Sequence, residues 1–476
     1  MIQKDSDTIC AIATANGHAG IGIVRLSGPK AISISKKIIG ISLKPRRATL
    51  VDMTLASSEL IDRGIALFFK SPHSFTGEDV VELHGHGGSQ VLVSLLNQCV
   101  ALGARLAAPG EFSERAFLNG KIDLLQAEAI ADLINASSAQ AARSAMRTLQ
   151  GVFSGKINQL VRDITKIRVD VEAAIDFSDE DIDIMESARV SDAMQTANHH
   201  FTQVFQAAQQ GLVIKDGITV VLAGIPNAGK SSLLNALAGS DTAIVTNIPG
   251  TTRDVLRQEI NLNGLPIHII DTAGLRYSKN VVEQEGVRRA LSALDEADLI
   301  LLVTDSTMYS DQDLSPIVET LCAGNYDGDT ADEKKSPAEI NHLLSRLCVV
   351  FNKIDLISNS KSGVSSTSYR EHELKLFRLS AKTNEGLNEL RDHLVEIAGY
   401  QNIGEGNFSA RERHLTALSD AQEALSSAIF GLGENLPLEL IAEDLRRVQA
   451  YLGAITGEVT SDDLLGEIFS SFCIGK

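Results

Sequence analysis

The sequence lacks the features that mark an exported, membrane-bound or disulfide-stabilised protein. None of its apolar runs approaches the roughly 20 residues of a membrane-spanning helix. Its first ten residues, MIQKDSDTIC, contain neither the basic nor the apolar segment of an export signal. Its five cysteines are far apart, with no CxxC pair, which argues against a disulfide framework or a zinc site. We therefore expect a cytoplasmic protein that does not bind a membrane.

The chain also lacks the positive charge of a general nucleic-acid binder, because its formal net charge is −18. This charge is unevenly distributed along the sequence. Residues 8–51 carry seven basic and no acidic side chains, and either an anion-facing surface or a solvated loop explains them. Residues 171–186 carry seven acidic and no basic side chains, which indicates a solvated acidic face.

The order of patterns predicts several domains, because 476 residues are too many for one core. Residues 1–118 alternate short β-type runs with turns and a helical stretch, which is typical of a small α+β domain. Helical spacing of apolar residues dominates 119–214 and returns in 401–476, and an α/β pattern occupies 215–400. We expect a multidomain α/β and α+β protein whose α/β domain is inserted into a helical domain. Two stretches without periodicity are interpreted as surface insertions, 322–339 and 357–373.

The stretch GIPNAGKS, Gly224 to Ser231, matches the pattern GxxxxGK[ST] of phosphate-binding loops. It follows a Val-rich strand and precedes an apolar helix, which is the context that phosphate binding needs. Glycines let backbone N–H groups curl around phosphates, and the helix N-terminus adds partial positive charge. We expect Lys230 to reach the terminal phosphates and Ser231 to bind Mg²⁺.

Three further motifs follow in order, each closing a hydrophobic strand. Asp271 in HIIDTAG is placed to hold the Mg²⁺ shell, and Gly274 can approach the γ-phosphate. Asp355 in LCVVFNKID can accept two hydrogen bonds from guanine that adenine cannot donate. A backbone N–H of the SAK segment, residues 380–382, can contact guanine O6. The four motifs together resemble those of translation-factor-type GTPases and predict a P-loop GTPase (Ras-like) domain.

The catalytic glutamine of Ras-type enzymes has no counterpart in this sequence. Those enzymes orient the attacking water with a Gln directly after the DxxG motif, where this chain has Leu275. Leucine cannot hydrogen-bond to water, so either hydrolysis is slow or another group does this work. Glu283 and Glu285 follow nearby, although spacing alone favours solvated acids at a helix start. The polar loop AIVTNIPGTTRD fits a switch that orders around Mg²⁺ and γ-phosphate, with Thr252 as a Mg²⁺ ligand.

Motifs from every part of the chain resemble one family. PNAGKSSLLNAL, GTTRDV and DTAGLR are similar to bacterial GTPases that have a hydrophobic residue in place of the catalytic Gln. SFTGEDVVELHGHGG, PGEFSERAFLNGKIDLLQAEAIADLI and the terminal FCIGK narrow this resemblance to the MnmE (TrmE) family of tRNA modification GTPases. The resemblance extends over essentially the whole chain.

The resemblance implies a homodimer whose G domains meet across the nucleotides, with hydrolysis activated by that meeting and by K⁺. Asn227, the carbonyls of Thr246 and Ile248, and Thr251 would bind the K⁺, which would take the place of an arginine finger. Glu283 matches the water-orienting glutamate of the family, so we predict that it is catalytic. The GTP-binding residues predicted from motifs and resemblance are Asn227, Ala228, Gly229, Lys230, Ser231, Ser232, Thr246, Asn247, Ile248, Pro249, Gly250, Thr251, Thr252, Asp271, Thr272, Ala273, Gly274, Asn352, Lys353, Ile354, Asp355, Ser380, Ala381 and Lys382.

The N-terminal domain resembles a tetrahydrofolate-binding and dimerisation fold, which implies 5,10-methylene- or 5-formyl-tetrahydrofolate as cofactor. Arg25, Glu82 and Lys121 fall in the folate-contacting motifs of the family. A carboxylate can accept hydrogen bonds from the edge of a pterin ring, and a Lys or Arg cation can bind the glutamate tail of a folate. The C-terminal segment of the family reaches back to the folate site, so Lys476 is expected to touch the folate. The resemblance also implies that Cys473 takes part in one-carbon transfer. It leaves open whether the thiol acts as a nucleophile, acts as an acid or only lies near the reacting groups.

The resemblance also implies a flavoprotein partner, MnmG (GidA), that supplies FAD and much of the tRNA surface in a heterotetramer or larger assembly. Together the two proteins would add a carboxymethylaminomethyl or aminomethyl group to C5 of wobble uridine 34. One alternative is a ribosome-assembly GTPase, which would carry a basic RNA-binding domain after the G domain. Another is a regulatory GTPase whose N-terminal domain only binds a small acid, for which GTP hydrolysis would not be needed to form a modified nucleoside.

Overall fold

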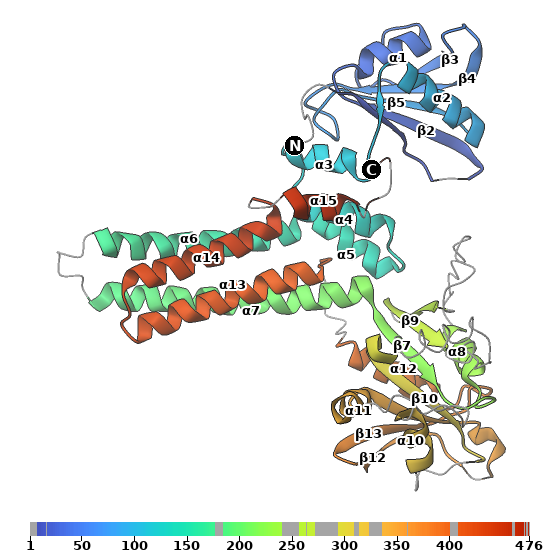
Figure 1. Ribbon diagram of the computed structural model, residues 1–476, viewed down its shortest axis with the longest axis vertical. Helices are drawn as coiled ribbons and strands as arrows, with labels where there is room; N and C mark the ends of the chain where they lie inside the picture. Colours follow the sequence, from blue (N-terminus) through green and yellow to red (C-terminus); the bar gives the residue numbers. More distant parts are fainter. Residues whose placement is uncertain are drawn as a thin grey trace. The chain divides into compact units, whose positions relative to one another are not determined.

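The structure, a computed structural model, describes most of the chain. The described residues are 7–15, 17–176, 184–239, 257–262, 264–271, 294–308, 314–322, 336–358, 360–399, 408–458, 462–470, 472 and 475. The chain divides into two compact units (Figure 1). One consists of Met1–Asn135, Ala145–Phe205 and Glu412–Lys476, and the other of Ala136–Ser144 and Gln206–Arg411. Most of the second unit is therefore an insertion within the sequence of the first.

The N-terminal part of the first unit is built on a six-stranded sheet with the order β3-β4-β5-β2-β1-β6. Its strands are β1 (Ile9–Ile12), β2 (Ala19–Ser27), β3 (Thr49–Thr54), β4 (Leu60–Phe69), β5 (Val80–Gly87) and β6 (Arg105–Leu106). Neighbouring strands are antiparallel except β1 and β6. Helices α1 (Ala31–Ile39) and α2 (Ser89–Ala101) cover one face, where alternate strand residues such as Val24 and Leu83 are buried.

Helices form the rest of the first unit (Figure 1). They are α3 (Glu111–Leu118), α4 (Leu124–Ile134), α6 (Val152–Asp176), α13 (Glu412–Gly433), α14 (Leu438–Thr456) and α15 (Asp462–Ser470). Helices α5 (Ala139–Leu149) and α7 (Ile184–Asp216) belong in part to each unit. Buried residues of α14 at helical spacing, among them Leu445 and Leu452, pack it against α6 and α13. Among the described helices, none combines the length and apolarity that a membrane span requires.

A buried ion pair joins helix α4, which precedes the insertion, to helix α13, which follows it. Arg413 donates hydrogen bonds of 2.8 and 2.7 Å to the two carboxylate oxygens of Glu128, and His414 Nε2 lies 2.8 Å from Glu128 Oε2. Glu128 and His414 are both buried. The Arg413 guanidinium also donates to the carbonyls of Ala454 and Ile455, near the end of α14. This network therefore holds the helical domain together on both sides of the insertion.

The second unit contains a seven-stranded sheet with the order β12-β13-β11-β10-β7-β9-β8. Its strands are β7 (Ile218–Ala223), β8 (Arg257–Leu262), β9 (Leu265–Asp271), β10 (Leu299–Asp305), β11 (Leu347–Asn352), β12 (Gly363–Tyr369) and β13 (His372–Arg378). The edge strands β8 and β12 pair antiparallel, and the strands between them are parallel. The carboxyl ends of β7, β9, β10, β11 and β13 therefore share one edge of the sheet.

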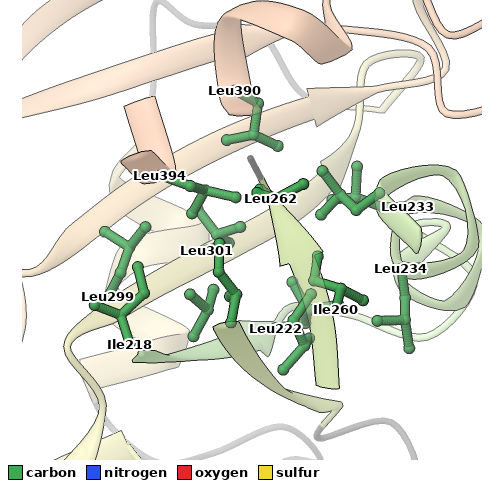
Figure 2. Packing of buried hydrophobic residues seen from close by; sticks show 14 of the residues in the cluster. Ile218, Leu222, Leu233, Leu234, Ile260, Leu262, Leu299, Leu301, Leu390 and Leu394 are labelled. Carbon is green, nitrogen blue, oxygen red and sulfur yellow. The ribbon is translucent and has the colours of Figure 1, made fainter. Parts of the chain in front are cut away.

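Helices cover both faces of this sheet, as expected for parallel strands with near-continuous apolar sequences. The helices are α8 (Lys230–Ala238), α10 (Ser315–Cys322), α11 (Pro337–Leu344) and α12 (Leu387–Ile397). Figure 2 shows one of the two resulting cores, in which Leu222 and Leu301 of the sheet lie among Leu233 of α8 and Leu390 of α12. A second core contains residues of α10 and α11. This confirms the predicted class, an N-terminal α+β domain, a helical domain and an inserted Ras-like α/β domain, whereas the predicted residue limits of the domains stay predictions.

The interpretation of residues 357–373 as a surface insertion is wrong. Most of this stretch forms β12 and the start of β13, which pair antiparallel from Gly363–Arg378 to Tyr369–His372. The sequence hides the strand because β12 lies at the sheet edge and exposes most of its Ser and Thr side chains. An edge strand needs no apolar run, because only one of its sides is paired and polar side chains protect the other from aggregation.

Replacing Glu128 with alanine is predicted to destabilise the first unit by about 3–5 kcal/mol, the usual cost of leaving a buried charge without its partner. Burial alone raises the pKa of Glu128, but the charges and hydrogen bonds of His414 and Arg413 outweigh it and hold the pKa below its ordinary 4.5. The stabilisation is therefore complete above pH 4.5 and declines as the pH falls further. Urea unfolding followed by circular dichroism at pH 7 and pH 4 measures both effects.

The matched control is Glu423→Ala, which removes an exposed acid from helix α13. It should change the free energy of unfolding by less than about 0.5 kcal/mol. Equal unfolding midpoints for the two variants would show that the buried network contributes nothing to stability.

Candidate functional site

The loop after β7 has the backbone conformation of a phosphate cradle. Gly224, Asn227 and Gly229 have φ values of 133°, 64° and 94°. A Cβ atom at Gly224 would lie 2.1 Å from the carbonyl oxygen of Val303, so only glycine fits there. Helix α8 begins at Lys230 directly after this loop, so the free N–H groups of its first turn face the same space. This arrangement suits an anion with several oxygens.

The Lys230 side chain is folded back onto the loop. Its ammonium donates hydrogen bonds to the carbonyls of Gly224 at 2.6 Å and Ile225 at 2.9 Å. Burial lowers the pKa of Lys230, and the charge of Asp271 opposes this effect. The ammonium is thus held at the loop, where it can exchange carbonyl oxygens for phosphate oxygens.

The predicted Mg²⁺ ligand Ser231 lies beside Asp271, the residue predicted to hold the Mg²⁺ shell. Ser231 Oγ, in the first turn of α8, donates to Asp271 Oδ2, at the end of β9, over 3.2 Å. A hydroxyl and a carboxylate oxygen are the hard ligands that Mg²⁺ prefers, and they lie beside the phosphate loop. The residues therefore fit this cation.

The buried Asn352 side chain connects the phosphate loop to the loops after β11 and β13. Its Nδ2 donates to the Ala228 carbonyl at 3.1 Å. Its Oδ1 accepts from the backbone N–H groups of Lys353 at 2.8 Å and Ala381 at 3.0 Å. A Cβ atom at Gly229 would come within 2.3 Å of Asn352 Nδ2, so the glycine makes this contact possible.

The carboxylate predicted to recognise guanine is held by a neighbouring hydroxyl. Ser380 Oγ donates to Asp355 Oδ1 at 2.6 Å. The same Ser380 oxygen accepts from the N–H of Thr383 at 3.2 Å, which fixes its direction. A carboxylate has acceptor capacity for further hydrogen bonds, so Asp355 can still receive two from a guanine edge.

The structure therefore gathers the described parts of all four motifs at one sheet edge. Ser232 lies exposed on α8, Ile354 is buried in the short 3₁₀ helix after β11, and Lys382 lies exposed in the turn after β13. The other predicted residues lie outside the described part of the chain, namely Thr246, Asn247, Ile248, Pro249, Gly250, Thr251, Thr252, Thr272, Ala273, Gly274, Glu283, Cys473 and Lys476. Their roles stay predictions.

The motif search missed Asp305, at the carboxyl end of β10. Asp305 Oδ2 accepts a hydrogen bond of 2.7 Å from Lys353 Nζ. The same ammonium donates to the Asn227 carbonyl at 2.7 Å. The available clue was the polar residue that closes the apolar run LILLVTD, because β9 and β11 end in the same way, in Asp271 and Asn352.

Two of the residues predicted to bind folate contact each other in the structure. Arg25 on β2 and Glu82 on β5 face each other in the sheet register and form an ion pair of 2.9 Å. His84 Nε2 lies 3.1 Å from the second oxygen of Glu82. Lys121 instead donates to the Pro72 carbonyl at 2.9 Å, and no hydrogen bond or ion pair among the described residues links it to Arg25 or Glu82.

Three features meet at the edge of the parallel sheet: a phosphate-binding loop, a Ser–Asp pair that suits Mg²⁺, and a guanine-recognition loop with the motif NKxD. Together they define a P-loop GTPase. The chain belongs to the MnmE family of tRNA modification GTPases. The family model "MnmE helical domain" matches residues 124–473, and "GTP-binding protein TrmE N-terminus" matches residues 8–121.

Several curated relatives named "tRNA modification GTPase MnmE" match over the full length. The relative from Marinobacter nauticus is 51% identical over 478 residues and covers 100% of both chains. The relative from Saccharophagus degradans is 50% identical over 477 residues, also with 100% of both chains covered. Among solved structures, the G domain of the T. maritima FeoB iron transporter is 27% identical, with 38% of this chain and 98% of that chain covered. Its TM-score is only 0.25, so the fold assignment rests on the sheet order described above.

Replacing Gly229 with alanine is predicted to weaken GDP binding by at least about tenfold. The φ of 94° disfavours alanine by roughly 1 kcal/mol or more, and the new Cβ would displace Asn352. Gly363→Ala is the matched control, because no atom lies within 4 Å of a Cβ at that position. Titration with a fluorescent GDP analogue measures both affinities, and equal values would mean that the contact with Asn352 does not shape the site.

Proposed function

We propose that this chain is a GTP-hydrolysing tRNA modification enzyme. With the flavoprotein MnmG (GidA), it would add a carboxymethylaminomethyl or aminomethyl group to C5 of wobble uridine 34. The observation that carries the proposal is the convergence of the phosphate loop, the Ser231–Asp271 pair and the Asn352 network at one sheet edge. The substrate class comes from the full-length relatives, whose name includes tRNA modification.

Guanine specificity is assigned to Asp355. Its carboxylate would accept hydrogen bonds from guanine N1–H and N2–H₂, a pair that adenine does not present. Ser380 keeps this carboxylate in place, and Ala381 N–H lies in the adjoining turn, where the backbone can contact guanine O6. The site would therefore favour guanine over adenine, because adenine has no pair of donors to give to this carboxylate.

Phosphoryl transfer in this site would depend on positioning and charge. Ser231 and Thr252 would hold Mg²⁺, with Asp271 in its surroundings, and Lys230 would bind the terminal phosphates. Because Leu275 cannot orient water, Glu283 takes this role. Bound K⁺, held by Asn227, Thr246, Ile248 and Thr251, would supply the positive charge that an arginine finger supplies elsewhere.

The N-terminal sheet is assigned to dimerisation and to folate binding. On the side opposite α1 and α2, directly paired residues form a row across four strands, Leu50, Ile65, His84 and Ile23. Leu50 is 65% exposed and Ile65 41% exposed, and this pair of exposed apolar side chains on a sheet face supports contact with a second copy of the chain. The Arg25–Glu82 pair lies in the neighbouring row and supports a ligand with both polar edges and a carboxylate tail, such as 5,10-methylene- or 5-formyl-tetrahydrofolate.

The remaining assignments concern partners and the C-terminus. Lys476 would contact the folate and Cys473 would take part in one-carbon transfer. The flavoprotein would bring FAD and most of the tRNA surface, which suits a chain with a net charge of −18. The complete assembly would be a cytoplasmic heterotetramer or larger.

Replacing Glu283 with alanine is predicted to reduce GTP hydrolysis at least about hundredfold, the usual effect of losing a group that positions or activates the nucleophile. GTP binding should stay within about twofold, because the role proposed for Glu283 is to hold the attacking water and not to bind the nucleotide. Phosphate release and nucleotide titration measure the two quantities, with Glu285→Ala as the matched control two residues away. Unchanged turnover in Glu283→Ala would remove this residue from the catalytic role.

The dependence of GTP hydrolysis on K⁺ tests the role assigned to this cation. Hydrolysis by the full-length chain should be fast in K⁺ and slower by about tenfold or more in Na⁺ at equal ionic strength, because losing one group that stabilises the charge of the transition state usually costs at least that much. Asn227→Ala should remove most of this difference. Equal rates in the two salts would contradict the K⁺ assignment and leave the guanine site unaffected.

A further inference from the structure

Asp305 uses both of its carboxylate oxygens inside the second unit. Oδ1 accepts from the Thr307 backbone N–H at 2.9 Å and from the Thr307 hydroxyl at 2.7 Å. Oδ2 accepts from Lys353 Nζ at 2.7 Å. The residue is only 8% exposed, so its charge is compensated almost entirely by these groups. Burial alone raises the pKa of Asp305, but the bonds from Lys353 and Thr307 outweigh it and lower the pKa, so the carboxylate is ionised at neutral pH.

Lys353 holds a second bond that reaches a different loop. Its ammonium donates to the Asn227 carbonyl in the phosphate loop at 2.7 Å. Its backbone has a φ of 67°, which is unusual for a residue with a side chain. Without such partners, a lysine ammonium is a point charge at the end of a flexible four-carbon chain. The pairing with Asp305 therefore selects one direction for a side chain that would sample many.

The loop after β10 supports the same arrangement through a separate contact. Ser306 donates to the Asn352 carbonyl from its backbone N–H at 3.0 Å and from its hydroxyl at 2.6 Å. Asp305 and Ser306 thus bind Lys353 and Asn352, the two consecutive residues that begin the base-recognition loop, and Thr307 holds the Asp305 carboxylate. Three loops, after β7, β10 and β11, meet at the Lys353 ammonium.

We propose that Asp305 is a positioning residue for nucleotide binding, whose carboxylate holds the Lys353 ammonium against the Asn227 carbonyl. The phosphate loop and the base-recognition loop are thereby joined before the nucleotide arrives. A nucleotide then binds without having to order the lysine, which saves conformational entropy at binding. The inference rests on the proposed function in one respect, namely that the ligand is a guanine nucleotide.

Asp305→Asn in the full-length chain tests the proposal by titration with a fluorescent GDP analogue in Mg²⁺. The amide keeps an acceptor for Thr307 but removes the charge that holds the lysine. We expect the Kd for GDP and the KM for GTP to rise about tenfold, the usual effect of losing a charged hydrogen bond. The kcat at saturating GTP should stay within about twofold, because the bound nucleotide completes the site.

The matched control is Asp298→Asn, the same change at the opposite end of β10. Asp298 Oδ2 accepts from the Thr219 N–H at 2.7 Å, away from the motif loops. This control should leave the Kd for GDP within about twofold of the wild type. A general effect of altered charge or sheet stability would change both variants alike and would overturn the proposal.

A double-mutant cycle asks whether Asp305 acts through Lys353. In a Lys353→Met background the lysine is already absent, so adding Asp305→Asn should raise the Kd by less than about twofold. If the Kd of the double variant instead rose by the product of the two single effects, the proposal would be overturned. A folded Asp305→Asn protein with wild-type Kd and KM would overturn it as well, and so would a fall in kcat with unchanged KM, which is the behaviour of a group acting only in the transition state.

If Asp305→Asn abolishes the thermal transition of the second unit, Thr307→Val replaces it. This variant removes one of the bonds that orient the carboxylate and should raise the Kd for GDP about threefold, whereas an unchanged Kd would contradict the proposal. GDP binding needs neither hydrolysis nor tRNA. Absence of GDP binding by the wild type would therefore contradict the proposed function itself, and equal binding by wild type and variant only this inference.

Discussion

The buried side-chain amide of Asn352 is the contact on which the nucleotide site depends. It is 2% exposed, and it satisfies both its donor and its acceptor on the backbone of three loops. A buried amide without these partners would cost about 1–3 kcal/mol, so the loops and the side chain fix each other. This arrangement is possible only because Gly229 has no Cβ and because parallel strands bring their carboxyl ends to one edge. The described part of the site is thus held together by the protein's own hydrogen bonds.

Much of this site could be predicted from the sequence, because its motifs combine two independent features. An apolar run marks each strand, and a glycine or polar residue marks the turn that follows it. Both features are local, so Lys230, Asp271 and Asn352 could be assigned without knowledge of the fold. The same approach missed Asp305, whose role depends on a partner 48 positions away in the sequence. It also missed the edge strand β12, because polar residues at a sheet edge carry no apolar periodicity.

The N-terminal sheet shows a different limit of sequence reasoning. Short β-type runs that alternate with turns and a helical stretch predicted the α+β class, and the register then places Arg25 opposite Glu82. Lys121 belongs to the same family motifs, yet its ammonium binds the Pro72 carbonyl. A resemblance transfers residue types along the sequence, and only three-dimensional contacts decide which of them meet. The buried Glu128–Arg413 pair makes the same point, because no local pattern connects α4 with α13.

These contacts differ between the two parts of the chain. The inserted GTPase domain is held together by buried hydrogen bonds, whereas the N-terminal sheet presents the exposed side chains of Leu50 and Ile65 and the Arg25–Glu82 pair. We propose that GTP hydrolysis in this chain serves the modification of wobble uridines. The first test is mass spectrometry of nucleosides from bulk tRNA of cells that lack this protein. We expect aminomethyl-type uridines to disappear and to return when the intact chain is restored. An unchanged nucleoside profile would contradict this proposal, and the chain would then be a GTPase with a different task.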